Sequence, residues 1–413
     1  MSNQVTSLAS GHEGSLSDQF RSYFLRLRGG EMGALPAIGA TIVLALIFAT
    51  LSPYFATDLN ITNLFVQSAE LTMLSAALVF VILLGEIDLA AGVTAGVAMA
   101  AFIVLVKQGG WGWIPALGVA FAVGAVVGWF IGFMVAKIGV PSFVVTLAFF
   151  LGFQGMQLVL LGEGGVYRVE NPEILAIMNS NMPSWAGWAM IVLCAAGTFL
   201  FGVWDRARRA KSGLVNRPLS ILALKTAAVL VIGGVGVWVM DQNRSQGVIK
   251  ISGVPIVVPI SIAILVFMTL ILDRTKFGRH LYAVGGNPEA ARRAGIKVAR
   301  IRIYAFIICA LLAVVSGVFH ASRIASVDGS SGRTIVLNGV AAAVVGGVSL
   351  FGGRGRLSHA AIGAIVISMI DNGLGLLQMP AGANFLITGG VLLLAATLDA
   401  LARRRSGGSI ARN

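Results

Sequence analysis

Four carboxylates interrupt the apolar stretches of this chain, where a charged side chain is costly. They are Glu70, Glu86, Asp88 and Asp371. A carboxylate at the centre of a bilayer costs at least about 2.5 kcal/mol on insertion scales, so each is expected to face protein or water rather than lipid. Asp371 is followed by Asn372, and the pair offers a carboxylate and an amide that suit the hydroxyl groups of a sugar. The alternative is hydrogen bonding between helices.

Glu86 and Asp88 stand two residues apart, so on a regular helix their side chains would diverge by about 200°. A backbone break at Gly85 would let both point to a watery cavity or to the cytosolic mouth of a path. The alternative is that they tie this break to neighbouring helix ends. Asn338, near the expected outer start of its helix, is a weaker candidate. The predicted substrate path thus consists of Glu86, Asp88, Asn338, Asp371 and Asn372.

The composition places these residues in a membrane protein. Of the 413 residues, 57% are hydrophobic and only 11% are charged, and the mean hydropathy is +0.89. A soluble domain carries roughly 25% charged residues. Twelve apolar runs, each about as long as a spanning helix, lie at 35–52, 64–84, 90–106, 113–136, 141–161, 185–204, 219–240, 255–272, 301–320, 335–350, 359–378 and 384–401. The sequence therefore predicts an all-α, polytopic transmembrane helical bundle with ten to twelve spans.

Basic residues indicate how these spans are oriented. When the loops alternate sides from a cytosolic N-terminus, most of the 30 Lys and Arg residues fall in cytosolic loops, as the positive-inside rule requires. The net charge of +13 is therefore a sign of topology, because the basic stripes interleaved with aromatics that are typical of a nucleic-acid surface are missing. We predict cytosolic tails over residues 1–30 and 403–413 around a transmembrane domain over 31–402, with both ends in the cytosol.

We predict no metal or cofactor in this chain. Cys194 and Cys309 lie far apart inside apolar runs, with no histidine or acid at metal-ligand spacing, so they are expected to be small core side chains. No G-x-x-x-x-G-K-[ST] loop is present to cradle the phosphates of ATP. The four histidines lie in the N-terminal tail or near helix ends, so no chain of carboxylates and histidines suggests a proton relay.

The longest basic loop, residues 273–302, carries the start and stop signals of a short helix, in the order Asn287, Pro288, Glu289, Arg292, Arg293 and Gly295. The asparagine can cap free amides, and the proline fits the first helical position. The arginines suit the last turn, and the glycine can take the left-handed conformation that ends a helix. We expect a cytosolic helix of about two turns, which is marginal alone in water and therefore needs a partner. A protein partner is one candidate, and an anionic lipid surface is the other.

Two glycine-rich segments follow apolar runs at corresponding places. They are Gly85-Glu86-Ile87-Asp88-Leu89-Ala90-Ala91-Gly92 and Gly346-Gly347-Val348-Ser349-Leu350-Phe351-Gly352-Gly353. Glycine meets polar residues in both, and the two share Gly, Leu and Gly at equivalent steps. We interpret them as a weak internal repeat that marks broken helices, which transporters place beside the transport path.

At these residues the sequence resembles the permease subunits of bacterial ABC sugar importers, the ribose, galactose and xylose group related to branched-chain amino-acid permeases. The resembling segments are GEIDLAAG (85–92), VPSFVVTL (140–147), FGRHLYAVGGNPEAARRAGI (277–296), AAAVVGGVSLFGGRG (341–355) and DNGLGLL (371–377). The extra hydrophobic pair around 219–272 looks most like the xylose permeases. One departure is that related permeases usually carry Glu-Leu-Asp where this chain has Val336-Leu337-Asn338.

The resemblance implies a multi-pass protein of the bacterial inner membrane that carries a monosaccharide, xylose or a related pentose, into the cytoplasm. It implies a homodimer in contact with membrane lipid, a cytosolic ATP-binding subunit that holds ATP and magnesium, and a periplasmic sugar-binding protein. The chain would be a transport subunit and not an enzyme. The residues that would couple it to the ATPase are Gly278, Arg279, Gly285, Gly286, Asn287, Pro288, Glu289, Ala290, Arg292, Arg293 and Gly295.

Two other classes remain open from the residues alone. A self-sufficient secondary transporter, coupled to protons or sodium, would use the membrane acids. A passive channel would leave a dedicated ATPase dock without a purpose.

Overall fold

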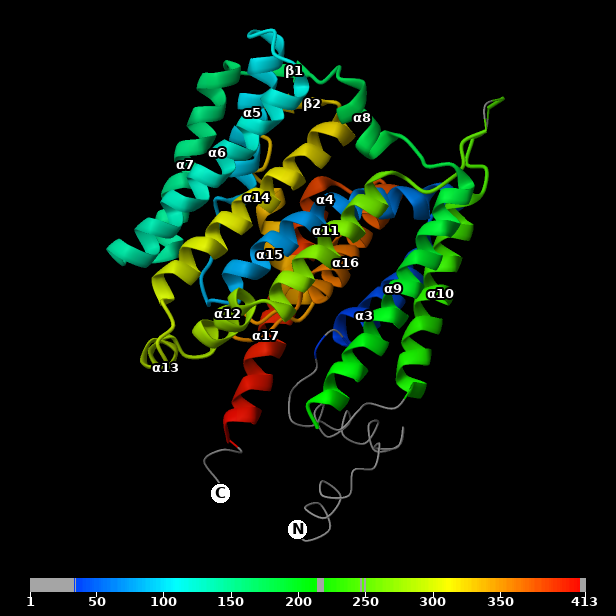
Figure 1. Cartoon of the computed structure of the whole chain (residues 1–413). Helices are drawn as coiled ribbons and strands as arrows, with labels where there is room; N and C mark the ends of the chain where they lie inside the picture. The colour runs from blue at the N-terminus through cyan, green and yellow to red at the C-terminus, as the bar shows by residue number, and fades with distance from the viewer. Residues whose placement is uncertain (1–32, 34, 214–218, 246, 249, 409–413) are drawn as a thin grey trace. The chain divides into compact units, whose positions relative to one another are not determined.

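The computed structural model of the chain is almost entirely helical (Figure 1). It describes residue 33 and residues 35–408, apart from 214–218, 246 and 249. The predicted N-terminal tail over 1–30 lies outside the described residues. The last helix runs on to Gly408, so the first part of the predicted C-terminal tail is helical.

Every one of the twelve apolar runs contains a helix. These helices are α3 (Leu35–Leu51), α4 (Asp58–Ile82), α5 (Ala91–Lys107), α6 (Trp113–Phe133), α7 (Ser142–Leu161), α9 (Ser184–Lys211), α10 (Leu219–Asp241), α11 (Val257–Arg274), α14 (Val298–Ile324), α15 (Ile335–Val345), α16 (Leu357–Leu376) and α17 (Ala381–Gly408). Within the described residues, eight helices are long and apolar enough to cross a membrane, and four shorter apolar ones accompany them. The prediction of a polytopic helical bundle is therefore confirmed.

Several shorter elements were not expected from the apolar runs. They are α8 (Pro172–Asn179), α12 (Lys276–Gly286), α13 (Pro288–Arg293), a π-helical turn η1 (Met134–Ile138), and the strands β1 (Val166–Arg168) and β2 (Ser326–Asp328). The two strands pair antiparallel, with Val166 opposite Asp328. They join the loop after α7 to the loop after α14, at the end of α14 opposite to α12 and α13 (Figure 1).

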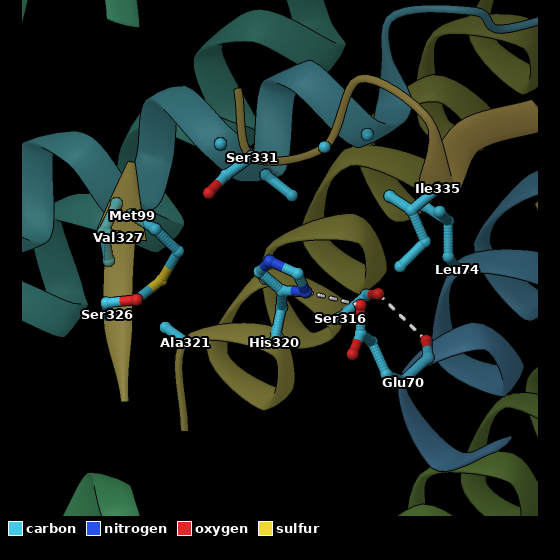
Figure 2. A pocket seen from close by; sticks show the side chains of 15 residues that line it. Glu70, Leu74, Met99, Ser316, His320, Ala321, Ser326, Val327, Ser331 and Ile335 are labelled. Carbon is cyan, nitrogen blue, oxygen red and sulfur yellow. Dashed lines mark hydrogen bonds and ion pairs between the residues drawn. The ribbon is translucent and has the colours of Figure 1, made fainter. Parts of the chain in front are cut away.

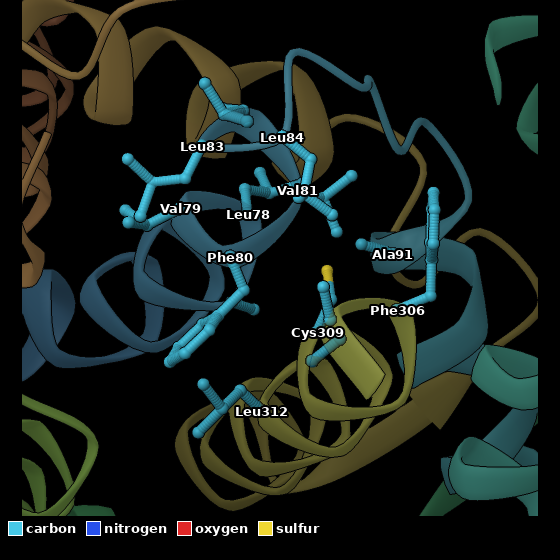
Figure 3. Packing of buried hydrophobic residues seen from close by; sticks show 14 of the residues in the cluster. Leu78, Val79, Phe80, Val81, Leu83, Leu84, Ala91, Phe306, Cys309 and Leu312 are labelled. Atoms are coloured by element: carbon cyan, nitrogen blue, oxygen red, sulfur yellow. The ribbon is translucent and has the colours of Figure 1, made fainter. Parts of the chain in front are cut away.

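The described residues form two compact units. The larger contains residues 33–180 and 255–401, and α4 and α14 form its centre. Figure 3 shows how their apolar side chains interlock, with Phe80 of α4 beside Cys309 and Leu312 of α14. Of the apolar stretch of α4, 83% is buried within the protein. These two helices are therefore the frame on which the other elements of this unit are positioned.

Glycines let neighbouring helices approach α14 closely. Gly124, Gly128 and Gly132 stand four residues apart on one face of α6. A Cβ at Gly128 would lie 2.6 Å from the carbonyl oxygen of Phe306, so no larger side chain fits without a shift. Small residues of this kind allow tight helix packing in lipid, where no hydrophobic effect drives helices together.

The second unit contains the described parts of residues 181–254 and 402–408, and most of it is the helical hairpin of α9 and α10. The side chain of Leu222 of α10 packs directly on Gly202 of α9, where a Cβ would collide with it. Only 17% of the apolar stretch of α9 and 11% of that of α10 is buried within the protein. Such exposed apolar helices are stable only where lipid or another protein covers them.

Two non-helical segments of the larger unit, called the helix breaks below, coincide with the glycine-rich segments. After α4 the chain runs without helix from residue 83 to residue 90, and Gly85 takes a left-handed conformation (φ +75°). After α15 it runs without helix from 346 to 356, where Gly347 and Gly352 are also left-handed (φ +98° and +81°). At 1.5 Å per residue the 11 residues of α15 span about 16 Å, which is too short to cross a bilayer core of about 30 Å.

Candidate functional site

The basic loop over residues 273–302, predicted to be cytosolic, folds into two consecutive helices, α12 and α13. Asn287 is the N-cap of α13, and its side chain accepts a hydrogen bond from the backbone N–H of Ala290 (2.9 Å). Pro288 occupies the first helical position, and Gly295 follows the end of the helix in the left-handed conformation (φ +81°). The predicted start and stop signals are confirmed. The helix has six residues, which agrees with the expected length of about two turns, and the preceding residues form the separate helix α12.

Nearly all of α13 is exposed. Ala291 is its one buried residue, and the packing of this side chain attaches α13 to the rest of the protein. Glu289 forms ion pairs with Arg292 (3.1 Å) and with Arg293 (3.4 Å), so the first and last turns of α13 are linked by pairs within the helix. The outward face therefore presents charged side chains and a stop glycine that no other described part of the chain covers.

The helix α12 binds α13 to the transmembrane core. Thr275 caps its start by accepting a hydrogen bond from the N–H of Gly278 (3.2 Å), and Leu281 and Val284 are buried. The hydroxyl of Tyr282 donates to the carbonyl oxygen of Gly355 (2.7 Å). Burial, assisted by the negative charge of Asp273, raises the pKa of Tyr282 to about 12, so this hydroxyl stays protonated as a donor.

The break after α4 lies along α14. Glu86 pairs with Arg302 (3.2 Å), and the carboxylate of Asp88 accepts from the thiol of Cys309 (3.6 Å) and from the N–H of Ala90 (2.9 Å). Arg302 and Cys309 are seven residues apart on α14, which corresponds to about 10 Å along its axis. The two acids therefore point to different levels of one helix, and the segment between them follows that helix without being helical.

The backbone of this break is satisfied by hydroxyl groups of α7. The N–H of Ile87 donates to the hydroxyl of Ser142 (3.2 Å), and the carbonyl of Ile87 accepts from the hydroxyl of Thr146 (3.2 Å). Non-helical backbone is tolerated in a membrane protein only where protein or water satisfies its polar groups. The segment VPSFVVTL thus has a physical role: it supplies those partners.

The two breaks and α12 meet at one point. The N–H of Gly353 donates to the carbonyl oxygen of Leu83 (2.8 Å), and the Cα of Gly285 packs directly on the same carbonyl, where any Cβ would collide. A Cβ at Gly352 would lie 2.8 Å from the backbone nitrogen of Gly85. Three of the segments that the sequence analysis selected therefore meet here through backbone contacts. They are 85–92, 277–296 and 341–355.

The other predicted path residues lie elsewhere. Asn372 of α16 exchanges two hydrogen bonds with Asn60 of α4 (2.9 and 3.0 Å). Asp371 has a buried oxygen, Oδ1, without a hydrogen-bond partner among the described residues, and Asn338 is half-buried on α15. The structure thus brings Glu86 and Asp88 to one break and places Asp371 and Asn372 at another helix pair. That these five residues contact a substrate stays a prediction.

A polar cluster inside the larger unit was missed. Glu70 of α4, whose side chain is 2% exposed, lies 2.8 Å from Nδ1 of His320 and accepts from Nε of Arg323 (3.0 Å), both on α14. The hydroxyl of Ser316 donates to the backbone carbonyl of Glu70 (2.9 Å), as Figure 2 shows. The sequence marked the acid as unusual but offered no sign that its partners stand 250 residues later.

The cluster borders a small cavity. It has a volume of about 20 Å³, and glycines 92, 96, 317 and 332 form part of its wall. Gly92 and Gly332 are in backbone contact, since a Cβ on either would collide with the carbonyl oxygen of the other. A cavity of this size holds about one water molecule. No group of three or more His, Cys, Asp or Glu side chains within the described part of the chain could hold a metal ion.

Comparison with known proteins identifies the family. The family described as branched-chain amino acid transport system / permease component matches residues 60–396. The chain belongs to this permease family. No solved structure matches it.

Individual relatives extend over nearly the whole permease. The xylose transport system permease protein XylH of Escherichia coli (strain K12) is 31% identical over 93% of this chain and 95% of its own length. XylH of Haemophilus influenzae is 32% identical over 88% of this chain and 94% of its own. The ribose import permease protein RbsC of Escherichia coli (strain K12) is 29% identical over 92% and 96%.

Membership establishes the class of protein. The chain is a multi-pass permease component of the cytoplasmic membrane, with membrane-spanning helices as its main structure. It is a transport subunit rather than an enzyme, and ATP hydrolysis would take place on a separate subunit. The family also implies an ATP-binding subunit and a periplasmic binding protein as partners.

Proposed function

We propose that this permease is the membrane subunit of an ATP-driven ABC importer that carries a monosaccharide, xylose or a related pentose, into the cytoplasm. The observation that carries the proposal is the exposed, capped helix α13, which directly follows α12, the helix that packs on both helix breaks. A short helix whose outer face is covered by no described residue is suited to docking a soluble subunit. The backbone contacts of α12 offer a route by which a movement of that subunit could reach the membrane core.

The energy source in this proposal is ATP, bound with magnesium on the partner. Two copies of the permease form the path, two ATP-binding subunits dock on their α13 helices, and a periplasmic binding protein delivers the sugar. Alternating access then results from the tilting of the docked loops, which biases two arrangements of the helices around the path.

The choice of a pentose rests on the relatives. Xylose and ribose permeases match this chain along most of its length, and the xylose permeases match at slightly higher identity. The carried sugar is therefore expected to be a pentose, with the binding protein doing most of the selection.

Uptake by the reconstituted complex tests this function. Proteoliposomes that contain the permease, its ATP-binding subunit and its binding protein should accumulate labelled xylose against a gradient when ATP is present. Labelled ribose and galactose are tested in the same way for comparison with xylose. A complex with a hydrolysis-deficient ATP-binding subunit is the control for the need for ATP hydrolysis.

Three results would overturn the proposal. The first is accumulation by the permease alone without ATP. The second is uptake that an uncoupler abolishes while ATP is held high, which would instead favour a secondary transporter. The third is equilibration without accumulation, which would identify a passive channel.

A further inference from the structure

Gly285 of α12 meets the two helix breaks, at Leu83 and Gly353, through backbone groups. Leu83 supplies the central carbonyl oxygen, which accepts from the N–H of Gly353 at 2.8 Å. The Cα of Gly285 packs on the same carbonyl from the side of α12. The carbonyl group of Leu83 thus lies in the first break and is hydrogen-bonded to Gly353 of the second. It also contacts α12, the helix that leads to α13.

Further contacts at this point leave little freedom for independent movement. A Cβ at Gly352 would stand 2.9 Å from the carbonyl oxygen of Gly285, and one at Gly353 would stand 3.0 Å from the Cα of Gly286. The hydroxyl of Tyr282 adds a bond from α12 to the second break. Packed cores respond to displacement by switching between discrete arrangements, because close-packed groups transmit strain.

The two breaks occupy corresponding places in the chain. One follows α4 and leads into α5, and the other follows α15 and leads into α16. A movement of α12 that displaced only one break would have to separate Gly353 from Leu83 and leave two backbone groups without partners.

We infer that α12 moves both helix breaks together, through the backbone clasp of Gly285, Leu83 and Gly353, so that one docking event drives α5 and α16 in the same step. This inference rests on the proposed function, because α13 must receive the movement of an ATP-binding subunit. It adds the positioning residues and the elements that move.

Neighbouring glycines provide a matched pair of variants. A Cβ at Gly285 collides with the carbonyl of Leu83, whereas a Cβ at Gly286 meets nothing within 4 Å. Both positions lie in the last turn of α12, so in both variants alanine replaces a glycine of the same helix. Any difference between the two variants therefore reports the clasp and not the helix.

The first measurement is the amount of labelled xylose moved per ATP hydrolysed by the full complex in proteoliposomes. Gly285→Ala is expected to bind the ATP-binding subunit and to permit hydrolysis, but to move at least about five-fold less sugar per ATP, within the usual range of coupling between sites. Gly286→Ala is expected to match the wild type. An unchanged ratio for Gly285→Ala would overturn the inference.

The second measurement needs neither a variant nor a sugar. Hydrogen exchange of the intact wild-type complex, with and without a non-hydrolysable ATP analogue, follows segments 83–90 and 346–356 separately. Both segments should change protection at the same nucleotide concentration, and a response confined to one of them would refute the clasp. If the wild-type complex moves no xylose while both segments respond, the sugar assignment fails and the clasp stands.

Discussion

The cap of α13 gives the sharpest test of the docking helix. Replacing Asn287 by Ala removes the side-chain acceptor for the N–H of Ala290, one of the four free donors at the start of a helix of only six residues. Loss of an N-cap costs about 1 kcal/mol, with a range of about 0.5–2 kcal/mol. Because α13 is exposed and short, this cost should disorder the helix rather than unfold the protein.

The cost should appear as weaker docking. If the ATP-binding subunit binds only the ordered helix, a loss of about 1 kcal/mol weakens binding about five-fold, and the full range corresponds to about two- to thirty-fold. The assay is a titration of the permease in lipid nanodiscs with labelled ATP-binding subunit. The thermal unfolding temperature of the permease should stay within experimental error of the wild type.

Two variants that keep a capping oxygen serve as controls. Asn287→Asp and Asn287→Ser still offer an acceptor to the start of the helix, so their affinities should remain within about two-fold of the wild type. Wild-type affinity for Asn287→Ala would show that the capped helix is not what the partner binds. Equal weakening of all three variants would show that the partner contacts the asparagine itself, and the reasoning from the cap would be wrong.

Three more perturbations test the same assembly. Arg292→Glu combined with Arg293→Glu should leave the free energy of unfolding within about 1 kcal/mol, since exposed ion pairs contribute little, but should weaken ATPase binding about ten-fold in the same titration. Glu70→Gln should destabilise the permease by about 1–3 kcal/mol in detergent melting, because it leaves a histidine and an arginine without their carboxylate; an unchanged melting temperature would contradict this. Tyr282→Phe should cost about 1 kcal/mol through the lost bond to Gly355. The raised pKa means that this stabilisation is complete below about pH 10 and is lost only as the pH rises through about 12, so chemical unfolding should show an equal loss at pH 6 and pH 9.

Local signals in the sequence were sufficient for most of the helices and for one functional element. The apolar runs predicted the apolar helices because most runs are about as long as a helix that crosses a bilayer. The cap at Asn287 and the stop at Gly295 were predicted because both act within a few residues of where they stand. The helix α12 was not predicted, since three of its eleven residues are glycines and its stability comes from packing by Leu281 and Val284.

Contacts between distant segments could not be predicted in the same way. Glu70 and Arg323 are 253 residues apart, and Asn60 and Asn372 are 312 apart. No periodicity or spacing connects such pairs, because they meet only after α4 has packed against α14 and α16. The convergence of the glycine segments has the same origin, although the weak repeat between them pointed to related positions.

The helix α9 carries tryptophans at both ends of its apolar stretch. From Trp185 to Trp204 there are nineteen residue steps, which correspond to about 29 Å and thus to the hydrocarbon thickness of an ordinary bilayer. Tryptophan rings settle at the level of the lipid headgroups, and the guanidinium of Arg208 lies over the ring of Trp204 (5.6 Å). An upright α9 therefore matches lipids of average acyl length, with its arginine-rich final turns beyond the headgroups. Lipids with shorter chains would force it to tilt or the surrounding membrane to thicken.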